Sequence, residues 1–485
     1  MRALAVALAG WLTIATVAPG PPAPFGAVPS PRQLDWHTLD TYAFLHFSPN
    51  TFTDREWGYG DEDPAIFNPT AFDPDRIVSA LKAGGMTGVI LTAKHHDGFC
   101  LWPTKTTRHS VAASSWKDGK GDVVREIADA ARRQGLRFGV YLSPWDRNHP
   151  SYGTPAYVEV YRAQLRELLT NYGEIFEVWH DGANGGDGYY GGAREERRID
   201  RRTYYDWLTT WALVRQLQPK AVIFSDVGPD VRWVGNEKGI AGETNWATFA
   251  PVAPDGGPAA PGLVREKESG TGHRGAPHWI PAECDVSIRQ GWFFHEKEND
   301  RVKTPDQLVD LYFQSVGRGC NLLLNVPPDR RGRLHEIDER SLAEFGERIR
   351  RLFATDLARG AKASASATRG GSAEYGPGKL IDGDRNSFWA PEEGQTTGEV
   401  VLEFAEPVTF SVVRLREHIA LGQRIGGFAV DRWTGSAWEE IAAGTTIGPT
   451  RLLRLPAPVT TQRVRLRIRE SAADPLISEL GLFRE

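Results

Sequence analysis

Between residues 35 and 355 the chain alternates short apolar runs with amphipathic helical patterns. Six runs have the length and composition of buried parallel strands: 42–47, 87–92, 136–142, 175–181, 221–225 and 321–326. Helix-period patterns lie between them, at 75–83, 123–133, 157–171 and 203–216. Two weaker strand candidates, 242–246 and 285–292, complete a set of eight. The alternation predicts an α/β domain with a (β/α)8-like TIM barrel. A doubly wound sheet is the alternative, but no glycine-rich phosphate loop follows the first strand.

The pattern changes near residues 354–362. From 364 to 485 the chain has short alternating strands separated by Gly, Pro and Asp turns, and helical patterns are nearly absent. The expected strands are 399–404, 411–417, 427–433, 463–468 and 476–483. This segment predicts an all-β sandwich domain of roughly 120 residues.

The first residues have a targeting pattern. Arg2 precedes an apolar stretch from Ala3 to Val17 that is too short to cross a bilayer, and a Pro-rich stretch follows. This predicts a signal peptide within residues 1–27, cleaved between Ala18 and Ala27, and therefore a secreted, extracellular protein. No later run reaches 18 apolar residues, so no membrane span is expected.

Composition narrows the functional classes. Lys and Arg total 57 against 62 Asp and Glu, a net charge of -5, and no basic surplus points to nucleic acid or an anionic membrane. The 16 Trp stand out against 2 Met, and indole faces are platforms for the apolar faces of sugar rings. Cys100, Cys284 and Cys320 are too few for a disulfide scaffold, and we expect buried thiols, with one disulfide as the alternative.

Polar and aromatic side chains follow the expected strands at their carboxyl ends, where TIM barrels build their active sites. In chain order these are His46 after the first strand, His95 and His96 after the second, Tyr141 and Trp145 after the third, Trp179, His180 and Asp181 at the fourth, and Asp226 and Glu237 after the fifth. One histidine at a strand end is usually structural, whereas four successive ends of this kind are hard to explain by packing. The pattern therefore indicates a functional site.

A metal hydrolase is one chemistry that these groups allow. Its ligands would be His46, His95, His96, His180 and Asp181. Adjacent residues on a strand point to opposite faces, so His95 and His96 do not readily share one ion. The chain also lacks H-x-H and H-E-x-x-H motifs, which disfavours this interpretation.

Glycoside hydrolysis is the second chemistry, and it needs two carboxyl groups that flank the scissile bond. Asp181 is the candidate nucleophile, because a short side chain on a rigid strand end is well positioned. A longer side chain on a loop suits the proton donor, and Glu237 follows the next strand. Asp226 and Glu243 remain competitors for that role.

The segments around these residues resemble the α-L-fucosidases of glycoside hydrolase family 29, over nearly all of residues 35–355. The matching segments are 44–47, 54–58, 94–99, 179–182, 234–237 and 321–328. The resemblance implies a retaining exo-α-L-fucosidase that acts on fucosylated glycans or glycoconjugates and needs no metal or cofactor for catalysis. Segments 54–58 and 235–237 resemble the branch of the family that prefers α-1,3- and α-1,4-linked fucose.

Residue roles follow from the same resemblance. It assigns Asp181 as nucleophile and Glu237 as acid/base, and it gives His180 no role. The fucose-binding residues that it implies are His46, Glu56, Trp57, His95, His96, Tyr141, Trp179 and Trp292. Two alternatives remain: a lectin-like fucose binder on an inactive barrel, against which the presence of both carboxylates argues, and a retaining hydrolase for another sugar, such as a galactosidase.

The C-terminal segment carries its own resemblance. Residues 380–384 followed by Phe388 and Trp389 resemble the start of a discoidin-like (F5/8 type C-like) or carbohydrate-binding module. Such a domain would either bind glycan or support the barrel structurally, and we favour support. Asp382 and Asp384 are candidate ligands for a structural calcium ion.

Overall fold

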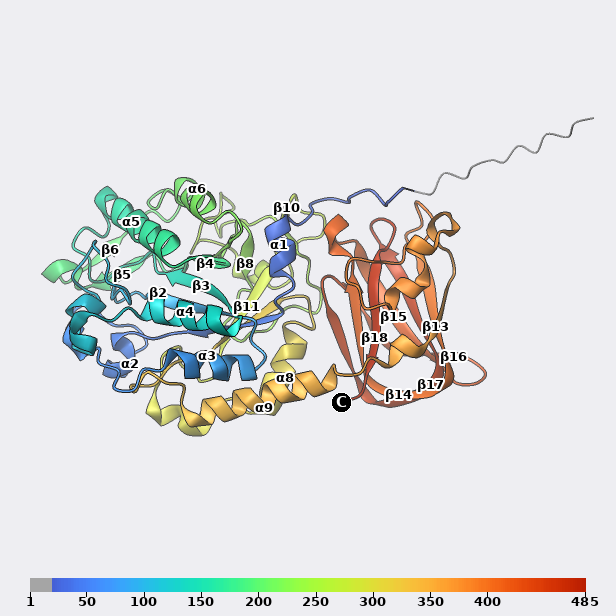
Figure 1. The fold of residues 1–485 in the computed structure, drawn as a ribbon. Coiled ribbons are helices and arrows are strands. Elements are labelled where there is room, and N and C mark those ends of the chain that lie inside the picture. Colours follow the sequence, from blue (N-terminus) through green and yellow to red (C-terminus); the bar gives the residue numbers. More distant parts are fainter. Residues whose placement is uncertain (1–19) are drawn as a thin grey trace, which may run out of the picture.

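The computed structural model describes residues 20–485 (Figure 1). The apolar stretch of the predicted signal peptide lies outside these residues. Eight parallel strands close into a barrel in the order β1-β12-β11-β8-β7-β4-β3-β2, which confirms the predicted TIM-like barrel. The barrel strands are β1 (Thr41–Leu45), β2 (Gly88–Lys94), β3 (Arg137–Leu142), β4 (Glu177–Trp179), β7 (Val222–Ser225), β8 (Val231–Trp233), β11 (Ala282–Ser287) and β12 (Asn321–Asn325).

Helices surround the barrel and short hairpins extend its loops (Figure 1). The helices are α1 (Pro31–Trp36), α2 (Pro49–Thr53), α3 (Pro74–Ala83), α4 (Val123–Gln134), α5 (Pro155–Asn171), α6 (Trp207–Leu217), α7 (Glu266–Ser269), α8 (Pro305–Gln314) and α9 (Glu336–Leu352). The short strands outside the barrel are β5 (Gly185–Gly188), β6 (Glu195–Arg198), β9 (Thr248–Phe249) and β10 (His278–Trp279). None of the helices within residues 20–485 is long and apolar enough to cross a bilayer.

Helix α4 shows how the sequence sets these elements. Asp122 caps its first turn by accepting a hydrogen bond from the Arg125 amide over 2.8 Å. The helix ends at Gly135, whose φ of 78° is a left-handed conformation that glycine adopts without strain. Its buried face begins with Val123 and Val124 and continues through Ile127, so that one side of the helix packs on the strands.

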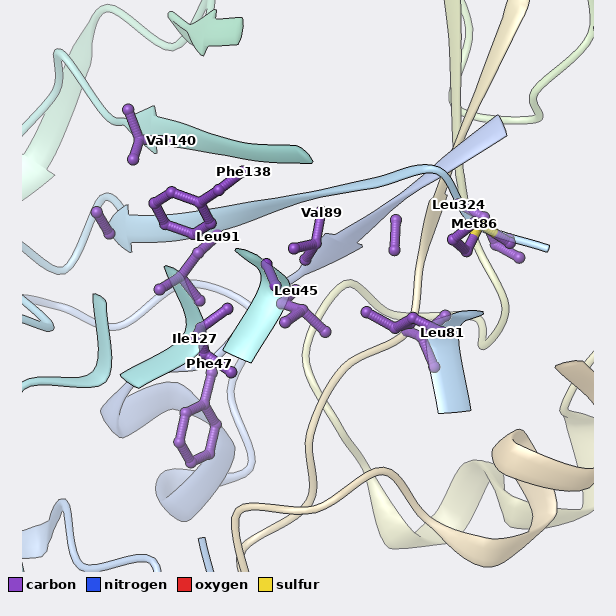
Figure 2. Packing of buried hydrophobic residues seen from close by; sticks show 14 of the residues in the cluster. Leu45, Phe47, Leu81, Met86, Val89, Leu91, Ile127, Phe138, Val140 and Leu324 are labelled. Carbon is purple, nitrogen blue, oxygen red and sulfur yellow. The ribbon is translucent and has the colours of Figure 1, made fainter. Parts of the chain in front are cut away.

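Side chains alternate along the barrel strands between two cores. In β1, Ala43 and Leu45 point outward into the layer between strands and helices, whereas Tyr42 and Phe44 point into the barrel. Figure 2 shows the outer layer, where strand residues pack with helix residues: Leu45, Val89, Leu91, Phe138 and Val140 with Leu81 and Ile127. The barrel is therefore filled on both faces of its sheet.

Two of the eight strand predictions are wrong in position. No strand forms at 242–246; β8 lies instead at Val231–Trp233, directly after β7. The strand expected at 285–292 is β11, Ala282–Ser287. Both strands carry buried ionisable side chains, so no apolar run marks them in the sequence. Arg232 donates to the carbonyls of Ser269 and Ile280, Asp285 accepts from Trp233 of the neighbouring strand, and Glu283 accepts from Trp179 across the barrel.

The cysteine expectation is corrected in part. Cys284 in β11 and Cys320, which precedes β12, form a disulfide with Cα atoms 6.0 Å apart, and Cys100 is a buried free thiol. The parallel pairing of β11 with β12 places the two residues side by side, which their separation in sequence does not reveal.

The C-terminal segment forms the predicted antiparallel β-sandwich. Its strands are β13 (Lys362–Ala365), β14 (Gly398–Glu417), β15 (Ile425–Trp433), β16 (Trp438–Gly444), β17 (Arg451–Ser471) and β18 (Ile477–Phe483). The separate strands expected at 399–404 and 411–417 are one long strand with register shifts, and β16 is an additional strand.

The sandwich is docked on the barrel. Val412, Leu452 and Phe483 belong to the same buried apolar cluster as the barrel's outer core. Gln423 accepts a hydrogen bond from the Ala247 amide over 2.7 Å. The N-terminal segment runs from α1 over the sandwich, where Phe25 donates its amide to the Leu421 carbonyl (Figure 1).

Candidate active site

A pocket opens at the carboxyl ends of the barrel strands. It brings together most of the residues predicted from the sequence. Its lining residues are Phe44, His46, Trp57, His95, His96, Tyr141, Trp179, Asp181, Ala183, Glu237, Asp285 and Trp292. Of the residues to which the resemblance assigns a catalytic or fucose-binding role, Glu56 alone is not part of this lining. The strand-end candidates Trp145, His180 and Asp226 also lie outside it.

Three neutral histidines form one side of the pocket. His46 Nδ1 lies 2.9 Å from Asn325 Oδ1, and His96 Nδ1 lies 2.7 Å from the Ser143 hydroxyl. Burial lowers the pKa of His46 to about 3 and that of His96 to about 4, and it places the pKa of His95 well below the usual value. Uncharged imidazoles with one donor and one acceptor are suited to sugar hydroxyls.

Asp181 is fixed directly after β4. Its Oδ2 accepts a hydrogen bond from the Tyr141 hydroxyl over 3.0 Å, and its Oδ1 accepts one from the Ala183 amide over 2.7 Å. Both carboxylate oxygens are therefore oriented by groups on rigid neighbouring segments. This is the preorganisation that a nucleophile at a sugar carbon requires.

Glu237 lines the pocket from the loop after β8 and also reaches solvent. Partial burial raises the pKa of Glu237, a hydrogen bond from the Trp292 side chain acts in the opposite direction, and Asp181 and Glu56 add to the increase. A raised pKa keeps a larger fraction of a carboxyl group protonated near neutral pH, which suits a general acid.

Aromatic side chains form the walls. Trp179 stacks on Phe224, with ring centroids 4.0 Å apart, and on Tyr141 at 5.3 Å. Trp57 is 54% exposed and meets His96 edge to face at 5.3 Å, so it stands at the pocket entrance. The ring centroids of Trp292 and His46 are 5.1 Å apart.

Glu56 lies behind Trp292. Its carboxylate accepts hydrogen bonds from the backbone amides of Trp292, over 2.7 Å, and Phe293, over 3.2 Å. The His295 ring contacts the same carboxylate, with Nε2 2.6 Å from Oε1. In this arrangement Glu56 holds a pocket wall rather than forming one, so its predicted contact with fucose stays a prediction.

The two competitors for the acid/base role are separated by the fold. Asp226 lines a second pocket that adjoins the first, together with Asp181, Glu237 and Asp285. Burial raises its pKa to about 7, with a further increase from Asp181. Glu243 lines neither pocket; its side chain is 76% exposed and pairs with Arg318 over 3.1 Å.

Asp285 and Trp233 line this region but escape detection in the sequence. The Trp233 indole donates to Asp285 over 2.7 Å, and burial raises the pKa of Asp285 well above its usual value. Both residues lie in β8 and β11, the strands whose positions were mispredicted. His180, which was given no role, is fully buried and pairs with the Tyr161 hydroxyl over 2.7 Å.

Neither metal hypothesis gains support from the side-chain geometry. Across residues 20–485, no group of three or more His, Cys, Asp or Glu is arranged to hold a metal ion. Asp382 accepts hydrogen bonds from the Asp384 amide and the Ser387 hydroxyl, and Lys379 Nζ lies 3.6 Å away. A calcium ion at Asp382 and Asp384 stays a prediction.

Comparison with known proteins agrees with this geometry. The alpha-L-fucosidase family model matches residues 25–351, and the F5/8 type C domain model matches residues 361–480. Alpha-L-fucosidase 1 of Arabidopsis thaliana is 47% identical over 468 residues, which is 96% of this chain and 89% of the plant protein.

Solved structures give the same result. A glycoside hydrolase 29 family member from an unknown rumen bacterium has a TM-score of 0.84 and 43% identity, over 95% of this chain and 78% of that one. A glycoside hydrolase 29 fucosidase of Ruminococcus gnavus in complex with fucose has a TM-score of 0.83 and 33% identity, over 96% and 97%. The chain therefore belongs to the α-L-fucosidases of glycoside hydrolase family 29, with an F5/8 type C domain after the catalytic barrel.

Proposed function

We propose that this α-L-fucosidase is a secreted enzyme that removes terminal α-1,3- and α-1,4-linked fucose from branched glycans, with Asp181 as nucleophile and Glu237 as acid/base. The observation that carries the assignment is the contrast between the two carboxyl groups in one pocket. Asp181 is held by two hydrogen-bond donors, whereas the pKa of Glu237 is raised.

The mechanism is double displacement with retention. Asp181 attacks the anomeric carbon and forms a fucosyl ester as the glycosidic C–O bond breaks, and protonated Glu237 gives its proton to the departing oxygen. Glu237, now a carboxylate, takes a proton from water, which attacks the same carbon and releases fucose and free Asp181. Glu237 keeps that proton and is ready for the next cycle.

Fucose recognition rests on the neutral histidines and the aromatic walls. His46, His95 and His96 present uncharged ring nitrogens to hydroxyl groups. Trp179 and Trp292 supply apolar surface for the ring face and the methyl group of a deoxy sugar. The Ruminococcus gnavus relative in complex with fucose supports this class of ligand.

The preference for branched glycans is supported by the second pocket. It continues from Asp181 and Glu237 toward Asp226, Trp233 and Glu266. Carboxylates accept hydrogen bonds from sugar hydroxyls and an indole stacks on a sugar face, so this side of Glu237 can hold the leaving-group sugar.

Secretion is supported by the Cys284–Cys320 disulfide, which is typical of an oxidising compartment, and by the targeting pattern within residues 1–27. For the sandwich we propose structural support of the barrel as its main role, because its buried residues continue the barrel's apolar cluster.

The test is fucose release from a panel of α-1,2-, α-1,3-, α-1,4- and α-1,6-fucosylated glycans and an aryl fucoside. We expect the highest kcat/KM on a Lewis-type trisaccharide, because binding energy from the neighbouring sugar is used in the transition state. Equal kcat/KM on the aryl fucoside and the trisaccharide would contradict the linkage preference. Fucose binding without release would indicate a lectin, and galactose release would indicate a different specificity.

Variants separate the two carboxyl roles. Asp181→Gly should abolish turnover of every substrate, and azide should restore part of it. Glu237→Gln should lower glycan hydrolysis by about 10²–10⁴-fold and affect an activated aryl fucoside less in the first step. Glu243→Gln is the matched control and should leave activity unchanged. If Glu237→Gln hydrolysed glycans normally and Asp226→Asn did not, the acid/base role would belong to Asp226.

A further inference from the structure

Two loops at the pocket mouth are joined by one histidine. The loop after β1 carries Asp54 and Glu56, and the loop after β11 carries His295. His295 Nδ1 lies 2.6 Å from Asp54 Oδ1, and its Nε2 lies 2.6 Å from Glu56 Oε1. The His295 side chain is 5% exposed, whereas the two carboxylates are about half-buried. We call these three residues the histidine clamp.

The geometry of the clamp favours a charged imidazole. A neutral ring has one N–H and one lone pair, so it can donate to only one of two carboxylates. Both ring nitrogens face carboxylate oxygens here, and only the imidazolium donates to both. With a neutral ring, a nitrogen lone pair would face a carboxylate oxygen at 2.6 Å.

The surrounding charges agree with this state. Burial lowers the pKa of His295, but the hydrogen bonds and charges of Asp54 and Glu56 outweigh it, so the pKa is raised above the usual value. Four other charged groups surround the clamp at its edges: Lys297, whose Nζ lies 4.0 Å from Asp54, Arg330, which lowers the pKa of Asp54, Glu298, which accepts the Gly291 amide, and Glu237. A fifth, the buried Arg289 guanidinium, donates to the His295 backbone carbonyl over 3.2 Å.

The clamp is connected to the catalytic pocket through Trp292. Glu56 accepts the Trp292 amide over 2.7 Å, and the Trp292 carbonyl accepts the Asn325 side chain over 2.8 Å. The Trp292 side chain and Glu237 line the same pocket, and Trp292 acts to lower the pKa of Glu237. The approach is close: a Cβ added to Gly291 would lie 2.4 Å from Glu56 Oε1, so the loop passes the carboxylate with no room for a side chain.

We propose that His295 is a positioning residue whose charged ring, held between Asp54 and Glu56, fixes Trp292 and through it the acid/base Glu237. The proposal rests on the proposed role of Glu237. His295 itself contacts neither the pocket nor the reacting atoms.

The clamp makes catalysis depend on pH in a defined direction. A group whose folded pKa is raised contributes its stabilisation below its ordinary pKa and loses it as pH rises through the folded value. Deprotonation of His295 removes one of the two hydrogen bonds of the clamp. It therefore adds a second ionisation, beside that of Glu237, to the alkaline limb of the pH–activity profile. Asp54→Asn removes this dependence, because an amide can donate to the lone pair of a neutral ring while Nε2–H donates to Glu56.

The experiment combines an NMR titration with activity profiles on an aryl α-L-fucoside. Histidine-labelled full chain gives the pKa of His295, and the His295→Gln spectrum assigns its signal. We expect titration above the ordinary value of about 6.5 in the native chain and a lower value in Asp54→Asn. His295→Gln should lower kcat/KM about 10–100-fold and remove one group from the alkaline limb. His278→Gln, at an exposed site, is the control and should change neither.

Gly291→Ala provides a test that alters no ionisable group. Its added Cβ should displace Glu56 and lower kcat/KM to a similar extent as His295→Gln. The proposal would be overturned if His295 titrated at or below its ordinary pKa. It would also be overturned if folded His295→Gln had the kcat/KM of the native chain and an unchanged alkaline limb. A folded native chain that hydrolyses no fucoside would refute the proposed function instead, and the titration would still decide the state of the clamp.

Discussion

Trp179 at the end of β4 donates its indole N–H across the barrel interior to Glu283 of β11, over 2.7 Å. Glu283 also accepts the Tyr42 hydroxyl and lies against Glu177. Burial, the neighbouring Glu283 charge and a hydrogen bond with Glu283 raise the pKa of Glu177 well above its usual value, and burial also raises that of Glu283. The two carboxyl groups therefore retain a proton between them, and this buried pair fixes a wall of the sugar pocket from below.

Replacement of Glu283 should affect both stability and substrate binding. Glu283→Ala leaves the Trp179 and Tyr42 donors without an acceptor, at a cost of about 1–3 kcal/mol for each. Glu283→Gln keeps an amide oxygen for Trp179 and should lose less. Urea unfolding and KM for an aryl fucoside measure the two effects, and equal stability and KM in Glu283→Ala and the native chain would contradict the link.

Buried neutral histidines should make the fold sensitive to acid. Burial lowers the pKa of His180 to about 3, so the unfolded chain, with a pKa near 6.5, binds the proton more readily between these values. Stability from this residue is present above pH 6.5 and is lost as pH falls toward the folded pKa, and each tenfold difference in proton affinity corresponds to about 1.4 kcal/mol. His180→Gln should show a smaller decrease in Tm between pH 7 and pH 4 than the native chain. An identical decrease in both proteins would show that His180 carries no such linkage.

The N-terminal segment should stabilise the sandwich. Arg424 donates to the Ala23 carbonyl over 2.7 Å, and Arg369 donates to the Gly20 carbonyl over 2.9 Å. A chain that starts at Val28 loses both acceptors. Its free energy of unfolding should be lower than that of a chain that starts at Gly20, by about 1–3 kcal/mol for a donor left without a partner, and its Tm should be lower as well. Activity at 25 °C should be equal, because these contacts lie on the sandwich. The mature protein should accordingly retain this segment, which N-terminal sequencing of the secreted enzyme tests.

The barrel and the sandwich should unfold together. A chain that ends at Ala358 exposes the apolar surface that Val412, Leu452 and Phe483 cover, so we expect low solubility and a reduced Tm. Gln423→Ala is a milder test, since this buried side chain bonds to Ala247 and Asn245. It should lower the free energy of unfolding by about 1–3 kcal/mol. Thr445→Ala removes an exposed hydrogen bond to Thr244 of the barrel domain and should lower the free energy of unfolding by less. Two separate thermal transitions in the native chain would contradict this coupling.

Much of the barrel is visible in the sequence because its first four strands lie in largely apolar runs followed by polar residues at their carboxyl ends. Asp181, the paired histidines His95 and His96, and Trp179 all lie at these ends, and the structure gathers them in one pocket. A strand end is a local feature, so it can be found without knowledge of the fold. The α-L-fucosidase resemblance rests on the same local segments.

Only the tertiary structure places the charged strands and the contacts behind the site. Arg232, Glu283 and Asp285 are tolerated in β8 and β11 because each finds a hydrogen-bond partner far away in the sequence: the Ile280 carbonyl, Trp179 across the barrel, and Trp233 of the neighbouring strand. The clamp likewise joins Glu56 to His295, 239 residues away. The sequence by itself determined the two fold classes and the residue types at the strand ends, since these follow from local periodicity. The position of Glu56 and the clamp were decided by barrel closure, which pairs β1 with β12 and brings the two ends of the domain together. The disulfide was decided by the pairing of β11 with β12.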